Sequence, residues 1–240
     1  AEFFYRNLMM TTMVMHESQA AGVKKFVTCM GGCSYPAQAP SPIKETSMWD
    51  GYPQAESAPY STAKKMAIVQ AEAYRRQYGF NAIVMVPGNL YGPYDNYNLN
   101  DSHVIPALIR KVFEAERRGD KQIVAWGSGA PVRDFIYSRD AARALILALE
   151  TYDAPEIINI SSGVQTTIKE LYALVTELCA FNGEVVWDTS KPDGQMYKGF
   201  DVTRMREVLG FTDITPLRQG LQETIAWFRA HYDTPGAVRL

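Results

Sequence analysis

Apolar residues along the chain follow two patterns, and the alternation of these patterns predicts an α/β protein. Short apolar runs bounded by glycine, proline or polar residues are typical of strands that are covered on both faces. Longer segments in which apolar residues recur at helical spacing predict amphipathic helices. The expected strands are 24–30, 81–87, 122–126, 157–160 and 184–188. The expected helices are 3–20, 57–78, 104–118, 138–150, one after residue 167, one near residue 204 and 219–232.

Boundary residues support two of these helices. Pro59 stands where the first turn of the helix at 57–78 is expected, and Gly79 follows its last residue. Proline is favoured at the start of a helix and glycine directly after its end. Thr167 and Glu170 have the spacing of a capping box, in which each side chain bonds the other residue's backbone amide.

Strands that alternate with long helices predict a doubly wound, mostly parallel sheet with helices on both faces. The later and shorter elements are expected to form a smaller α/β lobe beside that sheet. Ligands in such folds bind outside the carboxyl ends of the strands. The loops after Met30 and after Val86 follow two of these ends, so the sequence predicts a site there.

Composition narrows the possible partners. The 240 residues carry a formal net charge of −2, which gives no basic excess for binding nucleic acid, and no apolar run is long enough to span a bilayer. Three cysteines, Cys29, Cys33 and Cys179, are too few for a disulfide framework and fit a reducing, cytoplasmic location. Cys29 and Cys33 lack the clustered histidines of a zinc site, so no metal is expected.

Tyr60 and Lys64 stand four residues apart at the start of an expected helix, which places them on one face. A free tyrosine titrates near ~10, and a nearby ammonium group favours the phenolate and lowers that pKa. A phenol tuned in this way can exchange the proton of an alcohol–ketone pair while hydride moves to or from a nicotinamide. The spacing is common by chance, so the pair indicates this chemistry only together with its context.

That context resembles the extended short-chain dehydrogenase/reductase (NAD-dependent epimerase/dehydratase) family. The pair precedes a strand that ends in VPGNLYGP at 86–93. Four further stretches, in the family's order, are similar to its GDP-L-fucose synthase branch: GCSYP at 32–36, NDSHVIPAL at 100–108, WGSGAPVRDF at 126–135 and SKPDG at 190–194. The resemblance implies a Rossmann-like fold and a GDP-4-keto-6-deoxy-D-mannose 3,5-epimerase-4-reductase that uses NADPH.

The resemblance also assigns roles to residues. Tyr60 would protonate the sugar C4 oxygen, and Lys64 would hold the nicotinamide ribose and lower the pKa of Tyr60. Cys33 and His103 match the pair that removes and returns protons at C3 and C5, which a C4 ketone acidifies. The residues implied at the cofactor are Tyr60, Lys64, Pro87, Asn89, Leu90 and His103. Those implied along the GDP-sugar are Lys111, which falls where the family often carries arginine, Trp126, Arg133 and Lys198.

By the same resemblance, residues 1–95 form the C-terminal part of a dinucleotide-binding Rossmann domain. Residues 96–240 are expected to be mainly the substrate-binding lobe, with about 130–162 returning to the first domain. Family members pair as homodimers through two long helices, and the helices 3–20 and 59–78 correspond to these. A homodimer is therefore expected.

Two features depart from the family pattern. Gly31 stands where the family has a serine whose hydroxyl binds the C4 oxygen, so the hydride step is weakened or another group substitutes. The sequence has no Gly-x-x-Gly-x-x-Gly loop for the cofactor pyrophosphate, so the chain is expected to lack the first β-α units and could be inactive by itself. Two alternatives stay open: another nucleotide-sugar epimerase or dehydratase, and a non-catalytic nucleotide-sugar or NAD(P)-binding protein.

Overall fold

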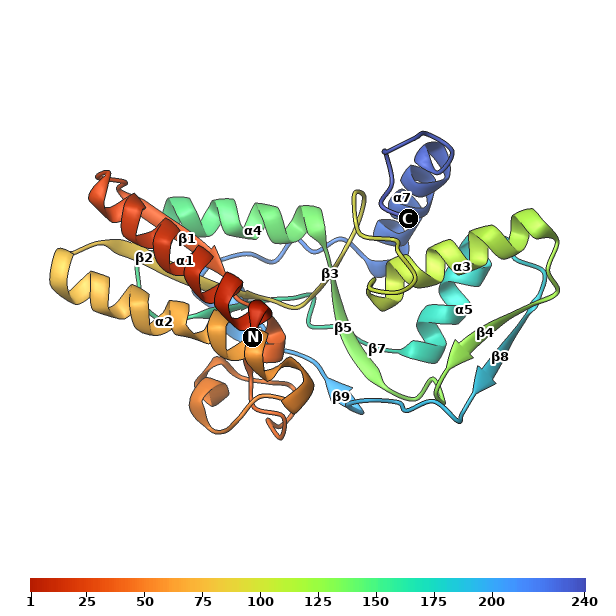
Figure 1. The fold of residues 1–240 in the computed structure, drawn as a ribbon, viewed down its shortest axis with the longest axis horizontal. Helices are drawn as coiled ribbons and strands as arrows, with labels where there is room; N and C mark the ends of the chain where they lie inside the picture. The colour runs from red at the N-terminus through yellow and green to blue at the C-terminus, as the bar shows by residue number, and fades with distance from the viewer. The chain divides into compact units, whose positions relative to one another are not determined.

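The computed structural model describes residues 1–240, and these form two compact units (Figure 1). Unit 1 consists of Ala1–Asn89, Asp140–Gly163 and Gly199–Asp213. Unit 2 consists of Leu90–Arg139, Val164–Lys198 and Ile214–Leu240. The chain therefore crosses between the units several times, and each unit is built from separate stretches of sequence.

Unit 1 contains a parallel three-stranded sheet in the order β1-β2-β6. Its strands are β1 (Lys25–Cys29), β2 (Asn81–Pro87) and β6 (Ile158–Ile160). The central strand β2 is buried from Ala82 to Val86, whereas every residue of the edge strand β1 is only half-buried. The continuous apolar run at 81–87 thus predicted its burial correctly, because a central strand between two helical layers has no solvent-facing side.

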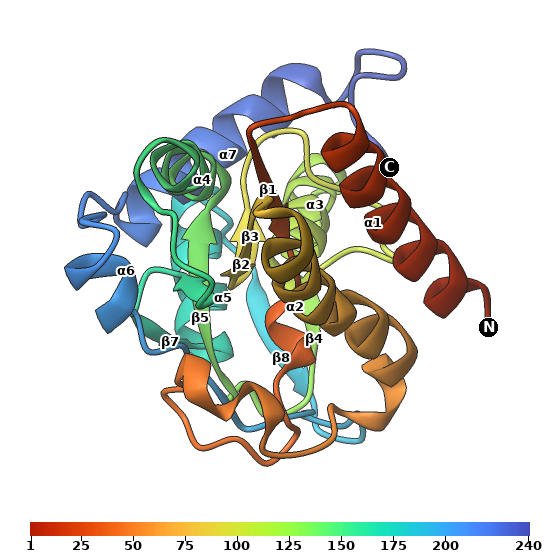
Figure 2. The same cartoon turned by 90° about the vertical axis from the view of Figure 1, so that its left-hand side faces the viewer.

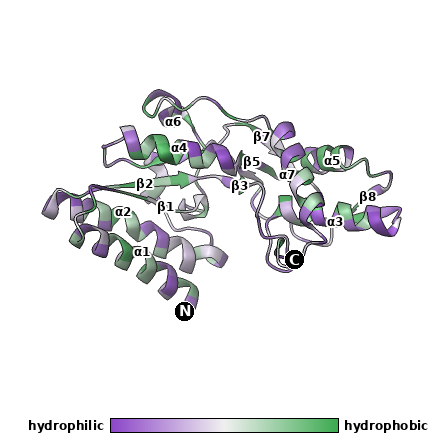
Figure 3. Ribbon diagram, turned by 90° about the horizontal axis from the view of Figure 1, so that it is seen from above, coloured by the Kyte–Doolittle hydropathy of each residue, from purple (hydrophilic) through white to green (hydrophobic).

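Helices cover both faces of this sheet, which confirms the predicted α/β class. They are α1 (Glu2–Ala20), α2 (Ala58–Tyr78), α4 (Ser138–Thr151) and α6 (Thr203–Glu207). Figure 3 shows α1 and α2 on one side of β1 and β2, and α4 and α6 on the other. None of the helices of the protein is both long and apolar enough to cross a membrane.

The helices α1 and α2 lie side by side (Figures 1 and 2). Nε2 of Gln70 on α2 donates a 3.0 Å hydrogen bond to the Thr12 carbonyl of α1, and Nδ1 of His16 lies 2.6 Å from the Tyr74 hydroxyl. Helix α2 begins with Pro59 in its first turn and ends at Gly79, whose φ of 64° is the left-handed conformation that glycine adopts without strain. Both predicted boundaries are confirmed.

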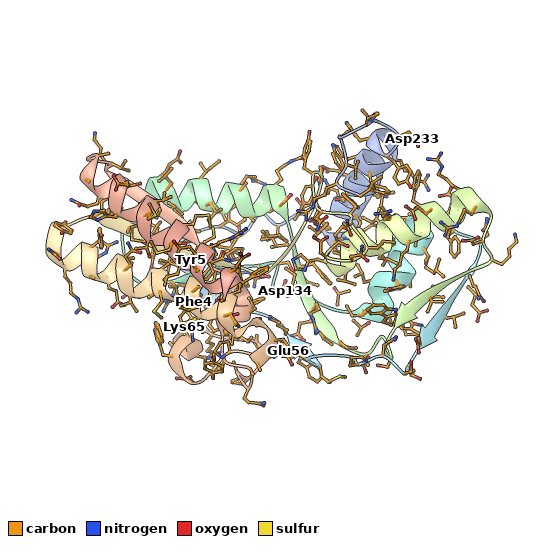
Figure 4. The ribbon with its side chains drawn as sticks, viewed as in Figure 1. Phe4, Tyr5, Glu56, Lys65, Asp134 and Asp233 are labelled. Carbon is orange, nitrogen blue, oxygen red and sulfur yellow. The ribbon has the colours of Figure 1, made fainter.

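Three short 3₁₀ helices occupy the long segment between β1 and α2. They are η1 (Gly32–Ser34), η2 (Glu45–Trp49) and η3 (Ala55–Ser57). The ammonium group of Lys65, which is labelled in Figure 4, is buried and donates a 2.7 Å hydrogen bond to the Met48 carbonyl. It also lies 4.9 Å from the centre of the Trp49 ring. These two contacts of Lys65 therefore hold this segment against α2.

Unit 2 has an apolar core between three helices and two small sheets. The helices are α3 (Val104–Arg118), α5 (Ile168–Leu178) and α7 (Leu217–His231). One sheet joins β3 (Asn89–Tyr91), β5 (Val132–Tyr137), β7 (Gln165–Thr167) and β9 (Tyr197–Lys198), and the other pairs β4 (Gln122–Trp126) with β8 (Glu184–Asp188). The capping box at the start of α5 is confirmed, with Thr167 and Glu170 each bonding the backbone amide of the other.

The sequence pattern did not predict β3, β5, β7 and β9. Arg133 and Asp134 interrupt the apolar pattern of β5, and β7 and β9 are only three and two residues long. These short strands form because neighbouring segments supply backbone partners, which is a tertiary effect that local sequence does not carry.

Candidate functional site

The carboxyl ends of β1 and β2 meet at one edge of the unit 1 sheet. Cys29 at the end of β1 is in register with Met85, and the loop of Gly31 and η1 follows directly. The β2 strand ends at Pro87, in register with Ile160 of β6, and Gly88 follows it. This arrangement places both predicted loops at the edge where ligands bind in doubly wound sheets.

Tyr60 and Cys33 lie together at this edge, beside Gly31. A Cβ added to Gly31 would stand 3.1 Å from Sγ of Cys33, 3.4 Å from Cε1 of Tyr60 and 3.6 Å from its hydroxyl. Tyr60 is carried by the first turns of α2 and Cys33 by η1, and both are half-buried. The structure therefore packs a phenol and a thiol closely against the backbone of residue 31.

Neighbouring hydroxyl groups hold η1 against α2. The Ser34 hydroxyl donates a 3.1 Å hydrogen bond to the Ser61 carbonyl, and the Ser61 hydroxyl donates a 3.2 Å bond to that of Ser57. Ser34 and Ser61 are fully buried. A Cβ on Gly32 would collide with the ring of Phe200, so the backbone of η1 is also closely packed on its other side. These contacts fix Cys33 relative to Tyr60.

A buried asparagine side chain holds the chain just after Cys33 against the sheet by hydrogen bonds. Asn159 on β6 is fully buried, and its Oδ1 accepts a 2.6 Å hydrogen bond from the Tyr35 hydroxyl. Its Nδ2 donates 3.0 Å bonds to the carbonyls of Ile43 and Asp201. Every polar atom of this side chain is thus paired, which is what a buried amide requires. No local sequence pattern points to Asn159, because its partners are distant in the chain.

The electrostatics of Tyr60 differ from the expectation based on Lys64. Burial raises the pKa of Tyr60 above its ordinary value, and the neighbouring Cys33 and Cys29 raise it further. Burial also raises the pKa of Cys29, and the Lys64 ammonium group partly offsets this effect. The prediction that Lys64 lowers the pKa of Tyr60 is therefore corrected. The cause is that burial, followed by the two neighbouring cysteines, outweighs the ammonium group around the phenol.

His103 belongs to unit 2, where it is the N-cap residue of α3 and is exposed. Asp95 is its electrostatic partner. Burial raises the pKa of Asp95, while the Asn96 amide, 2.7 Å from Oδ1, and the charge of His103 lower it. Asp95 belongs to none of the sequence motifs described above. Its position eight residues before a candidate catalytic histidine was the only signal that could have found it.

The predicted cofactor residues in this region follow the buried part of β2. Pro87 and Asn89 are half-buried, so the chain reaches the surface at the carboxyl end of the strand, and Leu90 is exposed. A Cβ on Gly88 would collide with the Ser161 hydroxyl at the end of β6, so a bare backbone is required there. The glycine therefore lets the end of β2 pack closely against the end of β6.

The predicted nucleotide-sugar residues all lie in unit 2 and form two pairs. Nζ of Lys111 lies 5.5 Å from the centre of the exposed Trp126 ring, and burial lowers the pKa of Lys111. Arg133 on β5 is directly opposite Lys198 on β9. Nη1 of Arg133 donates to the carbonyls of Val132 and Gln195, at 2.8 and 2.6 Å.

These pairs suit an anionic aromatic ligand. An exposed indole offers a ring face for stacking, and a guanidinium group can bind phosphate oxygens through two parallel bonds. The Ser-Lys-Pro-Asp-Gly stretch folds back on the turn after Trp126. Asp193 accepts hydrogen bonds from both the amide and the hydroxyl of Ser128, at 2.6 and 2.8 Å.

Comparison with known proteins gives consistent matches. Residues 1–161 match the model of the NAD dependent epimerase/dehydratase family. "Probable GDP-L-fucose synthase 1" of Oryza sativa subsp. japonica is 41% identical over 95% of this chain and 70% of its own length. GDP-L-fucose synthase of Escherichia coli (strain K12) is 36% identical over 97% of this chain and 75% of its own length.

A solved structure extends the likeness to three dimensions. The crystal structure of a GDP-L-fucose synthetase from Naegleria fowleri bound to NADP superposes with a TM-score of 0.93 at 30% identity. The match covers 100% of this chain and 75% of that chain.

Proposed function

The chain belongs to the NAD-dependent epimerase/dehydratase family, and from this we propose that it converts GDP-4-keto-6-deoxy-D-mannose to GDP-L-fucose by 3,5-epimerisation and NADPH-dependent 4-reduction. The observation that carries the proposal is the meeting of Tyr60 and Cys33 at the carboxyl edge of the sheet. A phenol and a thiol in one place can serve two proton transfers on the same sugar.

Epimerisation needs one group that removes a proton from carbon and another that returns a proton from the opposite face. The C4 ketone acidifies the hydrogens on C3 and C5, so a base of moderate strength suffices. We assign these roles to the Cys33 thiol and the His103 imidazole, because a thiol and an imidazole are side chains that can accept and return a proton. Asp95 would place a carboxylate charge beside His103 in this step.

Reduction needs a proton for the C4 oxygen. NADPH, when bound, supplies the hydride to C4. The raised pKa of Tyr60 keeps its hydroxyl protonated at neutral pH, so that it can donate to the oxygen as negative charge develops there. Lys64, one helical turn further along α2, is assigned to the cofactor ribose. Pro87, Asn89 and Leu90 would line the nicotinamide.

The GDP moiety is assigned to unit 2. Arg133 and Lys198 would neutralise the diphosphate, and Trp126 with Lys111 would hold one end of the nucleotide-sugar. Unit 1 would then bind the dinucleotide cofactor. Three free cysteines support a cytoplasmic location for this chemistry.

We include a homodimer in the proposal. Several large apolar side chains of α1 are exposed, including Phe3, Met10, Met13 and Val14, and α2 adds Val69. Phe4 and Tyr5, labelled in Figure 4, are also exposed, next to Phe3 at the start of α1. Apolar clusters of this kind mark protein interaction sites, and a second copy of the same helix pair is a suitable partner.

The test separates the two half-reactions. The full chain is incubated with GDP-4-keto-6-deoxy-D-mannose in deuterated water without NADPH, and deuterium at C3 and C5 is measured. NADPH is then added and its oxidation followed. We expect exchange in the first stage and oxidation in the second, with Cys33→Ser losing the exchange and Tyr60→Phe losing the oxidation. A protein that shows neither activity would instead support the alternative of a non-catalytic nucleotide-sugar or NAD(P)-binding protein.

A further inference from the structure

The loop before α3 carries His103, and its hydrogen bonds point to a residue that holds this histidine in place. We propose that Asn98 is a positioning residue for His103, because it joins the turn directly before the histidine to the segment 238–240. All of these residues belong to unit 2. This inference rests on the proposed function and deepens it, since it identifies what fixes the imidazole during proton transfer at carbon.

The backbone and side chain of Asn98 form the turn that leads into α3. The Asn98 carbonyl accepts hydrogen bonds from the amides of Asp101 and Ser102, at 3.2 and 2.9 Å. Its Oδ1 accepts a 2.9 Å bond from the amide of Asn100. His103 follows directly as the N-cap residue of α3, and its side chain makes no capping bond. The turn, rather than a bond of the imidazole to the helix, therefore sets where His103 begins.

The other end of the Asn98 side chain bonds the segment 238–240. Nδ2 of Asn98 donates a 3.2 Å hydrogen bond to the carbonyl of Leu240, which is 142 positions further along the chain. Beside it, the amide of Tyr97 donates a 2.9 Å bond to the carbonyl of Arg239. Two successive residues of the loop are thus bonded to two successive residues of this segment.

Both partners of the turn are themselves fixed in the unit 2 core. Val238 is buried in that core. Tyr97 is fully buried, and its ring centre lies 4.4 Å from that of Phe228 on α7. Nη1 of Arg110 on α3 donates a 3.1 Å hydrogen bond to the Tyr97 carbonyl. The turn before α3 is therefore held between the core and the segment 238–240.

An ion pair between the same two parts of the chain contributes less. Nη2 of Arg239 lies 2.8 Å from Oδ2 of Asp101, and the two side chains are 68% and 52% exposed. Exposed pairs of this kind contribute little to stability. The bonds of Asn98 and of the Tyr97 amide are therefore the ones expected to hold the loop, and Arg239→Ala provides a control that leaves them in place.

Two substitutions of Asn98 test the proposal. Asn98→Leu removes both side-chain bonds at similar size, whereas Asn98→Asp keeps an acceptor for the Asn100 amide but cannot donate to Leu240. We expect both variants to slow deuterium exchange at C3 and C5 of GDP-4-keto-6-deoxy-D-mannose about 10- to 100-fold, because a small displacement of a reacting group costs this much. Binding of GDP, followed by the fluorescence of Trp126, should be unchanged.

Hydrogen exchange of the backbone amides measures the turn itself, without any enzymatic reaction. The amides of Asp101 and Ser102 donate to the Asn98 carbonyl, so their exchange reports how often the turn opens. It should become about three- to tenfold faster in both Asn98 variants, which is the effect of losing one hydrogen bond. Arg239→Ala should leave this exchange and the deuteration of the sugar unchanged.

Unchanged deuteration of the sugar in Asn98→Asp would overturn the inference. An equal loss of GDP binding would also overturn it, since general damage to unit 2 would then explain the slower reaction, and so would an equal effect of Arg239→Ala. If the unmodified protein shows neither deuteration of the sugar nor NADPH oxidation, the proposed function itself fails. The amide exchange of residues 101 and 102 then still decides whether Asn98 holds this turn.

Discussion

Oδ1 of Asn159 accepts a 2.6 Å hydrogen bond from the hydroxyl of Tyr35, although the two residues are 124 positions apart in the chain. Asn159 lies on β6 and Tyr35 directly follows η1, which carries Cys33. The bond therefore links the position of the thiol to the end of the sheet. Tyr35 and Asn159 are both buried, and burial strongly raises the pKa of Tyr35. The hydroxyl of Tyr35 therefore keeps its proton and donates it to this hydrogen bond.

The first prediction concerns this bond. Tyr35→Phe leaves Oδ1 of Asn159 buried without its donor, which should lower the free energy of unfolding by about 1–3 kcal/mol. Deuterium exchange at C3 and C5 should slow more than NADPH oxidation, because Cys33 loses its fixed position. Denaturant unfolding and the two activity measurements check this.

Tyr172→Phe is the matched control for that change. Tyr172 is also buried but lies in unit 2, and burial alone raises its pKa. Its replacement should leave the ratio of exchange to oxidation unchanged. If both phenylalanine variants alter that ratio equally, the bond between Tyr35 and Asn159 does not position Cys33.

The second prediction concerns the titration of Tyr60. Burial and the two cysteines raise its pKa, so in the protein without cofactor its phenolate should form only above the ordinary value of ~10. The phenolate absorbance of the protein minus that of Tyr60→Phe isolates this group. Cys33→Ala should move the titration to lower pH, because one cause of the raised pKa is removed. A phenolate that forms near neutral pH would contradict the assignment.

The third prediction concerns Asp95. Burial raises the pKa of Asp95 in the folded protein above its value of ~3.9 in the unfolded chain. The protonated carboxyl group therefore contributes fully to the free energy of unfolding below pH ~3.9, and this contribution is lost as pH rises through the folded pKa. At pH ~7 the buried carboxylate is therefore a cost, and Asp95→Asn should raise the melting temperature there but not near pH ~3. The same variant should slow deuterium exchange about tenfold or more, since a neutral amide removes the negative charge beside His103.

Asp101→Asn is the control in the same loop. Asp101 is exposed and its Oδ2 lies 2.8 Å from Nη2 of Arg239, so its removal should change stability by less than about 1 kcal/mol. It should also leave deuterium exchange unaffected. A loss of exchange in Asp101→Asn as large as in Asp95→Asn would indicate that loop order, rather than the charge beside His103, matters.

The fold was predictable where local pattern and tertiary setting agree. The buried strand β2, the boundaries of α2 and the capping box of α5 follow directly from apolar runs, Pro59, Gly79 and the Thr167–Glu170 pair. The strand β5 was not predictable in this way. Its Arg133 and Asp134 interrupt the apolar run, and its pairing with β7 and β9 depends on segments far along the chain.

The candidate site, like the fold, was predictable only in part. Tyr60 and Cys33 were identified from motifs, and the structure places them together. The direction of the Tyr60 pKa was missed, because the four-residue spacing to Lys64 is visible in the sequence whereas burial and the approach of two thiols are not. Asn159 was missed for a related reason, since its bonds join three distant segments.

The fourth prediction concerns binding of GDP in unit 2. Arg133→Ala should weaken the binding of GDP about 10- to 100-fold, because a hydrogen bond to a charged group contributes about 1.5–3 kcal/mol. The fluorescence of the exposed Trp126 provides the signal, and Trp126→Phe should remove it. Arg139→Ala is the control, since Arg139 is an exposed arginine that pairs with Glu223. Equal weakening by both arginine variants would show a general charge effect instead of a site at Arg133.

The fifth prediction concerns the apolar surface of α1. Met10 and Val14 lie one helical turn apart and are each at least 50% exposed, so Met10→Lys with Val14→Lys places two charges on this face without disturbing the core. The protein should sediment as a dimer, and the double variant as a monomer, because burying two lysines in an apolar interface is costly. Val208→Lys, another exposed apolar position of unit 1 beside α6, should remain dimeric. A monomeric unmodified protein, or dissociation by Val208→Lys as well, would refute an interface on α1.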